Sequence, residues 1–143
     1  IRDRNTAELW DPATGAWSDM PPMAEGRRGP GCCVLPSGRV AVVGGHLGDY
    51  QERHDGEAFD PVARTWQPLP PMARARQQHG VVAVAGGLLV VGGACDTPAE
   101  LFDEASGRWL ELPHPMVEPR RSTVAVSLPA AALLAAPSAA PAN

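Results

Sequence analysis

The sequence predicts an all-β fold of repeated blades, and three recurring residue types lead to that prediction. The first is a Glu-x-aromatic-Asp stretch that starts at Glu8, Glu57 and Glu100, with spacings of 49 and 43 residues. A tryptophan follows each stretch with the same two spacings, and a methionine follows with spacings of 49 and 44 residues. A period of roughly 40 to 50 residues, with short strands inside each unit, indicates a β-propeller rather than a helical solenoid.

The most complete unit, residues 74–116, contains turn signals between short apolar stretches. Ala85-Gly86-Gly87 separates two β-branched stretches and predicts a hairpin. A second turn is expected at 104–107, which is rich in small and polar residues. Four strands are therefore expected, at 78–84, 88–91, 100–103 and 108–112.

The preceding unit has the same order of strands but a longer loop. Strands are expected at 31–35 and 39–43, with a Pro36-Ser37-Gly38 turn between them and a Gly44-Gly45 pair after them. The loop at 46–56 holds eleven residues, where the next unit needs about six. Insertions in repeat proteins occur in loops on one face, often the binding face, so this loop is the first candidate for recognition.

Two kinds of repeated side chain are expected to serve packing. The tryptophans should fill the wedge between neighbouring blades, because a large flat side chain suits a surface that is covered on both sides. They are Trp17, Trp66 and Trp109. Each repeated glutamate should form a buried ion pair with an arginine of its own or the adjacent blade, and we expect Glu57→Ala to loosen or unfold the domain. The arginines considered for this role are Arg28, Arg74, Arg76, Arg120 and Arg121.

Taken in order, these residues resemble the kelch repeat. Its pattern runs from an arginine-containing first strand through a Gly-Gly pair to a Glu-x-aromatic-Asp-Pro strand and a tryptophan, and the likeness extends from Thr6 to about Val126. The resemblance implies a kelch-type β-propeller of four-stranded antiparallel blades that acts mostly as a platform for protein interaction. The chain departs from the family where a tyrosine is usual, at Trp10, Phe59 and Phe102, and where Glu104 replaces a proline.

The chain holds about three blades' worth of sequence, which predicts an incomplete ring, since closed propellers have roughly 4 to 8 blades. It starts at Ile1, and we expect it to be part of a longer protein. The last unit is degenerate, because Ala135-Ala136 stands where the Gly-Gly pair is expected. The expected divisions are half a blade at 1–26, full repeats at 27–73 and 74–118, the start of a degenerate repeat at 119–128, and an Ala/Pro-rich tail at 129–143.

Composition argues against several classes of partner. The formal net charge is −4, and all twelve basic residues are arginines spread along the chain, so no nucleic-acid partner is expected. Ser122 to Asn143 carries no charge, but its three prolines argue against a membrane span. Cys32, Cys33 and Cys95 have neither metal-site nor disulfide-scaffold spacing and are expected to be small buried apolar residues.

Recognition is predicted at the long loop, where the repeats differ. No catalytic residue, metal site or cofactor is expected, although His46, Asp49, His54 and Asp55 are residue types that can ligate a divalent metal. Arg74 and two glutamines at the blade junctions are expected to assist the loop. The predicted binding residues are His46, Asp49, Tyr50, Gln51, Arg53, His54, Arg74, Gln77 and Gln78.

The function predicted on this basis is a non-enzymatic protein-interaction module that binds protein partners through its inter-strand loops. Some proteins with blades similar to kelch repeats are enzymes that act on sugars, such as galactose oxidase and a sialic acid epimerase. The copper centre of the oxidase is associated with two tyrosines, and this chain has one, Tyr50. The alternatives to a binding module are therefore a propeller-fold enzyme acting on sugars and a non-functional fragment of a longer protein.

Overall fold

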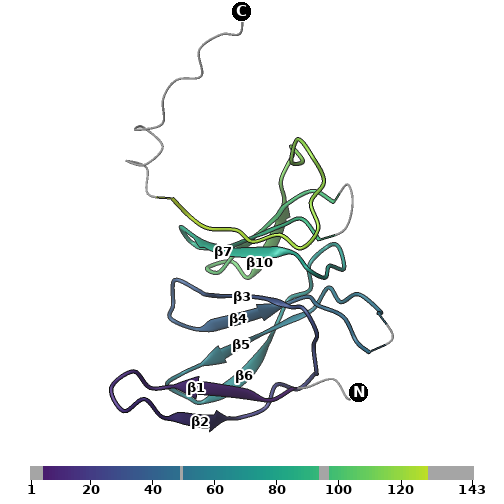
Figure 1. Ribbon diagram of the computed structural model, residues 1–143. Helices are drawn as coiled ribbons and strands as arrows, with labels where there is room; N and C mark the ends of the chain where they lie inside the picture. The colour runs from purple at the N-terminus through teal and green to yellow at the C-terminus, as the bar shows by residue number, and fades with distance from the viewer. Residues whose placement is uncertain (1–4, 49, 94–96, 129–143) are drawn as a thin grey trace, which may run out of the picture.

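The computed structural model describes residues 5–48, 50–93 and 97–128, and these residues form strands, turns and loops without a helix. Their ten strands make three antiparallel sheets that are stacked one on another (Figure 1). The stack is open, with the first sheet at one end and the third at the other. The prediction of an all-β array of propeller blades is confirmed.

The first sheet has two strands, and the other two sheets have four each, joined in chain order. The first sheet pairs β1 (Ala7–Trp10) with β2 (Trp17–Met20). The second sheet contains β3 (Gly31–Val34), β4 (Val40–Val43), β5 (Gly56–Asp60) and β6 (Thr65–Leu69). The third contains β7 (Gly80–Val84), β8 (Gly87–Val91), β9 (Glu100–Asp103) and β10 (Arg108–Glu111).

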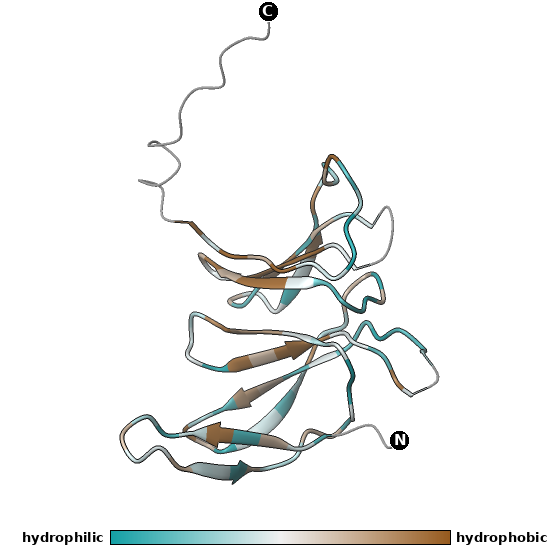
Figure 2. Cartoon of the chain, viewed as in Figure 1, coloured by the Kyte–Doolittle hydropathy of each residue, from teal (hydrophilic) through white to brown (hydrophobic). Residues whose placement is uncertain are grey.

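The hydrophobic core lies between the second and third sheets. Apolar residues concentrate on the strands that face this boundary, whereas the connecting loops are mostly hydrophilic (Figure 2). Burial of this apolar surface is the main contribution to the stability of the fold. The buried cluster consists of Leu35, Ala41, Val43, Ala58, Leu69, Met72, Leu88, Val90 and Phe102.

In the third sheet, the Glu100 carboxylate joins three parts of the blade. Its Oε1 accepts a hydrogen bond from Arg76 Nη2 at 3.0 Å, and both side chains are fully buried. The carboxylate also accepts hydrogen bonds from the backbone N–H groups of Ala73 and Arg74, at 2.7 and 3.2 Å. One side chain on the third strand therefore fixes the segment that leads into the first strand.

The second sheet repeats this arrangement. Glu57 accepts hydrogen bonds from the backbone N–H groups of Ala24 and Glu25 at 2.9 and 3.3 Å, and Arg27 Nη2 lies 3.4 Å from its Oε1. The predicted buried ion pairs are confirmed for Glu57 and Glu100, and both connect residues of the same blade. We call this set of contacts the Glu–Arg clamp of a blade. The prediction is wrong for Glu8, which is exposed and forms no ion pair with a described residue, because no described segment covers its side of the two-stranded sheet.

In the second sheet, the arginine that forms the clamp is not the one that was predicted from the sequence. Arg27 forms the clamp, whereas the backbone of the predicted Arg28 pairs with His46. Arg27 and Arg76 each follow the repeated methionine by four residues, so counting from Met23 and Met72 would have identified both.

The Glu–Arg clamps also depend on the glycine pair that follows the second strand of each blade. Arg27 Nη1 donates to the carbonyl oxygen of Gly44 at 3.2 Å, and Arg76 Nη1 donates to that of Gly92 at 3.1 Å. Gly44 has φ +64°, and a Cβ there would lie 2.7 Å from the carbonyl oxygen of Arg76 in the next blade. Only glycine permits both this backbone conformation and such a close approach.

The tryptophans pack against the connection from the preceding sheet. Trp66 Nε1 donates to the carbonyl oxygen of Pro21, and Trp109 Nε1 donates to that of Pro70, both at 2.7 Å. Both rings are partly buried. The prediction is wrong for Trp17, which is 67% exposed, because no described segment covers the face of the two-stranded sheet on which it lies.

The departure from the repeat pattern at Glu104 has a structural role. Its carboxylate accepts hydrogen bonds from Arg39 Nη2 at 2.8 Å and from the Ser37 backbone N–H at 3.1 Å. Ser37 lies in the β3–β4 turn and Arg39 follows it just before β4, so Glu104 connects the second sheet to the third. A proline at this position would offer no acceptor side chain.

The cysteine prediction is wrong in part. Cys32 is exposed and Cys33 is half-buried, and both are free thiols. Neighbouring residues on a strand face opposite sides, so Cys32 points toward the first sheet, where the packing is incomplete. Burial raises the pKa of Cys33 to about 11. Cys95 and the predicted tail at 129–143 lie outside the described residues.

His79 is buried at the boundary between the second and third sheets. Its ring packs where a side chain on Gly31 or Gly44 would lie, since a Cβ at Gly44 would be 2.6 Å from its Cε1. Burial, reinforced by the positive charge of Arg76, lowers the pKa of His79 to about 4. The imidazole is therefore neutral at pH 7.

We predict that Glu57→Ala lowers the free energy of unfolding by about 1–3 kcal/mol, because the N–H groups of Ala24 and Glu25 would lose their acceptor and buried Arg27 would keep only the partly exposed Asp55 as its ion-pair partner. The matched control is Glu111→Ala, which removes an exposed carboxylate 3.5 Å from Arg74 and should cost about 0–1 kcal/mol. Denaturant titration followed by circular dichroism measures both. Equal losses in the two variants would contradict the structural role of the clamp.

We predict that His79→Leu removes a pH dependence of stability. Between pH 6.5 and 4 the unfolded chain binds a proton at His79 that the folded chain does not, so the wild type loses stability as pH falls. The loss is on the order of 3 kcal/mol over this range, at about 1.4 kcal/mol per pH unit. Melting curves of both proteins test it. An imidazole NMR signal of His79 that titrates near pH 6.5 in the folded wild type would refute the assignment.

Candidate functional site

Backbone hydrogen bonds fix both ends of the long loop between β4 and β5. His46 forms backbone hydrogen bonds with Arg28 in both directions, at 2.9 and 3.0 Å. Further along, the Arg53 N–H donates to the Gly45 carbonyl oxygen, and the Arg53 carbonyl oxygen accepts from the Arg76 N–H, both at 2.8 Å. The loop is thereby attached to its own blade and to the start of the next one.

An aromatic pair occupies the outer part of the loop. The rings of His46 and Tyr50 are stacked, with centroids 5.2 Å apart and planes 9° from parallel. The turn that presents Tyr50 is closed by a hydrogen bond from its N–H to the Leu47 carbonyl oxygen at 3.0 Å, and Tyr50 adopts φ +63°. Tyr50 is 74% exposed, so the stacked pair presents the tyrosine to solvent.

A group of charged side chains lies at the inner end of the loop. Arg53 donates to both carboxylate oxygens of Asp55, from Nε at 2.7 Å and from Nη2 at 2.6 Å. Arg27 donates to the same two oxygens, each at 3.1 Å. The hydrogen bonds from Arg53, together with the nearby Arg27, hold the pKa of Asp55 well below its usual range.

Among the residues predicted at the blade junctions, Gln77 meets the loop. Its Nε2 donates to Glu52 Oε1 at 3.1 Å. The backbone of Gln78 bonds to Gly29 and Thr123, and the Arg74 side chain pairs with Glu111. The structure therefore brings Gln77 to the loop and gives Gln78 and Arg74 other contacts.

A depression of about 570 Å³ lies beside the charged group. Three of its lining residues, Gln51, Arg53 and His54, were predicted as binding residues. The sequence did not single out Leu47 and Glu52, because loop residues without strand or helix periodicity give no signal of which side chains share a face. Asp49 lies outside the described residues. The complete lining is Leu47, Gln51, Glu52, Arg53, His54 and Asp55.

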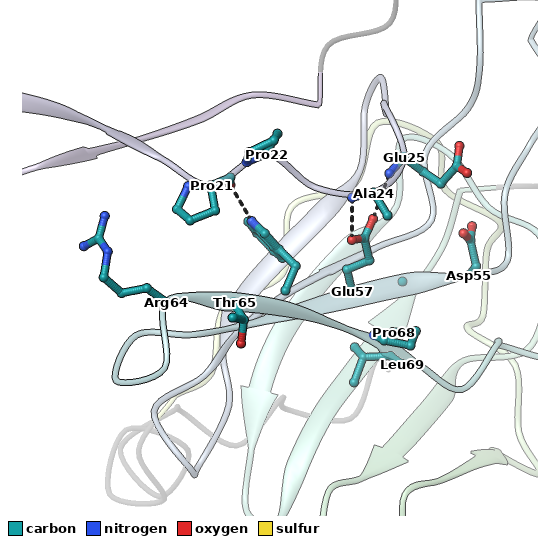
Figure 3. Close-up of a pocket in the computed structure, with 12 residues that line it drawn as sticks. Pro21, Pro22, Ala24, Glu25, Asp55, Glu57, Arg64, Thr65, Pro68 and Leu69 are labelled. Carbon is teal, nitrogen blue, oxygen red and sulfur yellow. Dashed lines mark hydrogen bonds between the residues drawn. The ribbon is translucent and has the colours of Figure 1, made fainter.

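A second depression, of about 520 Å³, lies between β5, β6 and the connection from the first sheet (Figure 3). Its polar groups are used by the fold. Figure 3 shows Glu57 hydrogen-bonded to Ala24 and Glu25, and Pro21 accepting the hydrogen bond from the tryptophan of β6. This depression belongs to the Glu–Arg clamp rather than to a ligand site.

No three His, Cys, Asp or Glu side chains among the described residues are grouped closely enough to hold a metal ion. Nor does any helix there have the length and apolar character needed to cross a membrane.

Comparison with known proteins identifies the second sheet and its flanking segments. Residues 26–73 match the family model of the Kelch motif, which covers the Arg27–Glu57 clamp, the long loop and Trp66. The resemblance to the kelch repeat is confirmed for this part of the chain. No curated protein matches the chain. Kelch repeats generally act in protein interaction.

We predict that Asp55→Asn reduces stability at neutral pH by about 1 kcal/mol, since the carboxylate is partly exposed. The folded-state pKa of Asp55 lies below its unfolded value, so its contribution is present above about pH 4 and is lost as pH falls through the folded-state pKa. The difference between wild type and variant should therefore shrink below about pH 4. Urea titrations at a series of pH values test this, and a difference that stays constant down to pH 2.5 would contradict it.

Proposed function

Because its second blade is a kelch repeat, we propose that this chain is a non-enzymatic module that binds a protein partner through the loop at 46–55. The main observation in support is the contrast between this loop and the clamp. The second and third blades build the same Glu–Arg clamp, whereas the loops that follow their glycine pairs differ in length and sequence. Residues that all blades share serve packing. Recognition of a specific partner is therefore assigned to the segment in which the blades differ.

The side chains of the loop suit a protein interface. Tyr50 offers a large aromatic surface with few rotatable bonds, and its ring is supported by His46. Tyrosine and arginine are enriched in protein interfaces and among the residues that contribute most to binding. The depression next to Arg53 could receive a side chain of the partner at the centre of such a contact.

The charged groups of the site support binding rather than catalysis. Asp55 is held between Arg53 and Arg27, and Glu52 accepts from Gln77. A general base needs a carboxylate or imidazole that is available to the substrate, with a pKa near the working pH. The lowered pKa of Asp55 is unsuitable for that role but suits a fixed charge that orients a partner.

We predict that Tyr50→Ala weakens partner binding by 10- to 100-fold without lowering the melting temperature, because the exposed ring contributes to contact rather than to folding. The control is Val62→Ala, which alters a 93% exposed residue on the β5–β6 turn and should change affinity less than about twofold. Candidate partners would be captured with the wild-type chain and identified by mass spectrometry. The affinity of the most enriched one for each variant would then be measured by calorimetry.

Two results would count against the proposal. One is a partner that binds Tyr50→Ala as tightly as the wild type but loses affinity for Val62→Ala, which would place recognition on the opposite turns. The other is turnover of a sugar by the purified chain, which would favour the enzymatic alternative.

A further inference from the structure

His79 is a buried titratable side chain that neither the clamp nor the candidate binding site uses. It is 5% exposed, and no described group forms a hydrogen bond with either of its ring nitrogens. The matching positions of the other repeats, seven residues after the methionine, hold Pro30 and Thr123, which do not titrate. The repeat pattern therefore does not require a group that can bind a proton at this boundary.

The ring occupies the contact between the second blade and the start of the third. A Cβ on Gly44 would lie 2.6 Å from Cε1 of His79, and a Cβ on Gly31 would lie 3.0 Å from its Nε2. One edge of the imidazole thus faces the backbone of the second sheet. An imidazolium ion enclosed in this way would lose its hydration without gaining a hydrogen-bond partner.

The charges on the third-sheet side also disfavour a proton on the ring. Burial lowers the pKa of His79 to about 4, and the positive charge of Arg76, which is fully buried, contributes to this shift. The Glu100 carboxylate is engaged by Arg76. Arg120 and Arg121, on the segment that follows the third sheet, are exposed. These charges are therefore either cationic or already paired with a cation.

Nor do the described residues of the second sheet supply a counter-charge for the ring. Arg27 donates to the Gly44 carbonyl oxygen at 3.2 Å, so another cation lies close to the contact. Its carboxylate partners, Asp55 and Glu57, are held 3.1 and 3.4 Å from its Nη2. Cys33 packs against the core between the two sheets, and burial raises its pKa to about 11, so it is neutral. Protonation of the ring would therefore add a positive charge beside two buried arginines.

The hydrogen bonds that join the two blades around His79 lie outside the strand ladders. His79 precedes β7, which begins at Gly80, and the long loop follows β4, which ends at Val43. The bonds run from Gly45 to the Arg76 oxygen, from Arg76 to the Arg53 oxygen, from Gln78 to the Gly29 oxygen and from Gln77 to Glu52, at 2.8, 2.8, 3.3 and 3.1 Å. Separating them leaves both four-stranded sheets intact.

Each blade keeps its own clamp when these bonds separate. Arg76 remains bound to Glu100 in the third blade. In the second blade, Arg27 remains bound to the carbonyl oxygens of Gly44 and Asp55, at the two ends of the loop. The loop would therefore leave the third blade while it stays attached to the second, and His79 would become exposed to water.

We propose that protonation of His79 opens this boundary and detaches the loop at 46–55 from the third blade. The proton is stable on an imidazole that water can reach, but not on one that is enclosed between two blades. The device is thus a local separation of the second and third blades in acid. The movement does not depend on what the loop binds, whereas a resulting loss of partner affinity rests on the proposed function.

The opening should occur between about pH 6.5 and pH 4. The pKa of an exposed histidine is about 6.5, whereas that of His79 in the closed boundary is about 4. Above pH 6.5 the ring is neutral in both forms, so the boundary keeps its full stability. As pH falls, the open form binds the proton first. The ratio of open to closed molecules should therefore rise roughly 50-fold between pH 7 and pH 4.5.

Amide hydrogen exchange followed by NMR tests the movement. The intrinsic exchange rate of an amide falls in proportion to hydroxide concentration, whereas the open fraction should rise by nearly the same factor. The observed exchange rates of the Gly45, Arg76 and Gln78 amides should therefore stay nearly constant between about pH 6 and pH 5. Amides in the ladder between β8 and β9 should exchange more slowly at each pH, because their hydrogen bonds survive a local opening.

Three variants assign the response to a residue. His79→Leu removes the titrating group, so the same three amides should exchange more slowly as pH falls. His79→Gln retains a polar side chain of similar length and should give the same result, which separates loss of the proton site from a change in packing. His114→Gln, at an exposed histidine outside the boundary, is the control and should keep the wild-type response.

Two results of the exchange experiment would overturn the proposal. Boundary amides that exchange no faster than those of the β8–β9 ladder at any pH would show that the chain opens only by global unfolding. A wild-type response that persists in both His79→Leu and His79→Gln would assign the proton to another group.

Partner affinity is measured separately, so that the two proposals can fail independently. For the partner captured with the wild-type chain, affinity should fall between pH 7 and pH 5, and His79→Leu should reduce this loss. An exchange response without any change in affinity would count against the loop as the binding site and leave the movement supported. Absence of the exchange response would overturn the movement whatever the affinity does.

Discussion

The buried carboxylate on the third strand of each blade is the interaction on which the rest of this structure depends. It holds the arginine and the backbone N–H groups that precede the first strand, and the arginine in turn fixes the glycine pair at the end of the second strand. A buried ion pair contributes little net stability after desolvation, but removing one partner is costly. The clamp therefore specifies the arrangement of the strands, while the apolar cluster between the second and third sheets provides most of the stability.

Much of the fold could be predicted from the sequence because its signals are periodic. Strand positions follow from apolar stretches bounded by glycine and proline, and the third strand of the last complete blade was predicted without error at both ends. The exposure of Trp17 could not be predicted, since the same residue type is packed or exposed depending on whether a neighbouring segment covers it. The arginine assignment failed by one position because Arg27 and Arg28 are adjacent and chemically identical.

The candidate site was predictable in location but not in geometry. An unequal loop length marks the segment between β4 and β5, and this can be read from residue spacing alone. The stacking of His46 on Tyr50 depends on a backbone turn in which a non-glycine residue, Tyr50, adopts a positive φ. No pattern in the sequence predicts such a turn. Likewise, the hydrogen bond from Gln77 to Glu52 could not be predicted, because it depends on how successive blades are placed relative to each other.

The arginine of the clamp has a further consequence for the loop. Arg27 Nη1 donates both to Gly44, where the loop departs, and to the carbonyl oxygen of Asp55, where it returns, at 3.2 and 3.0 Å. Arg76 makes the same two attachments in the third blade, to Gly92 and Pro98, around a shorter connection. The entropy of closing a loop grows only with the logarithm of its length once its ends are fixed. Each blade can thus accept insertions between these two attachment points at little cost, so that recognition can diversify while the scaffold remains the same.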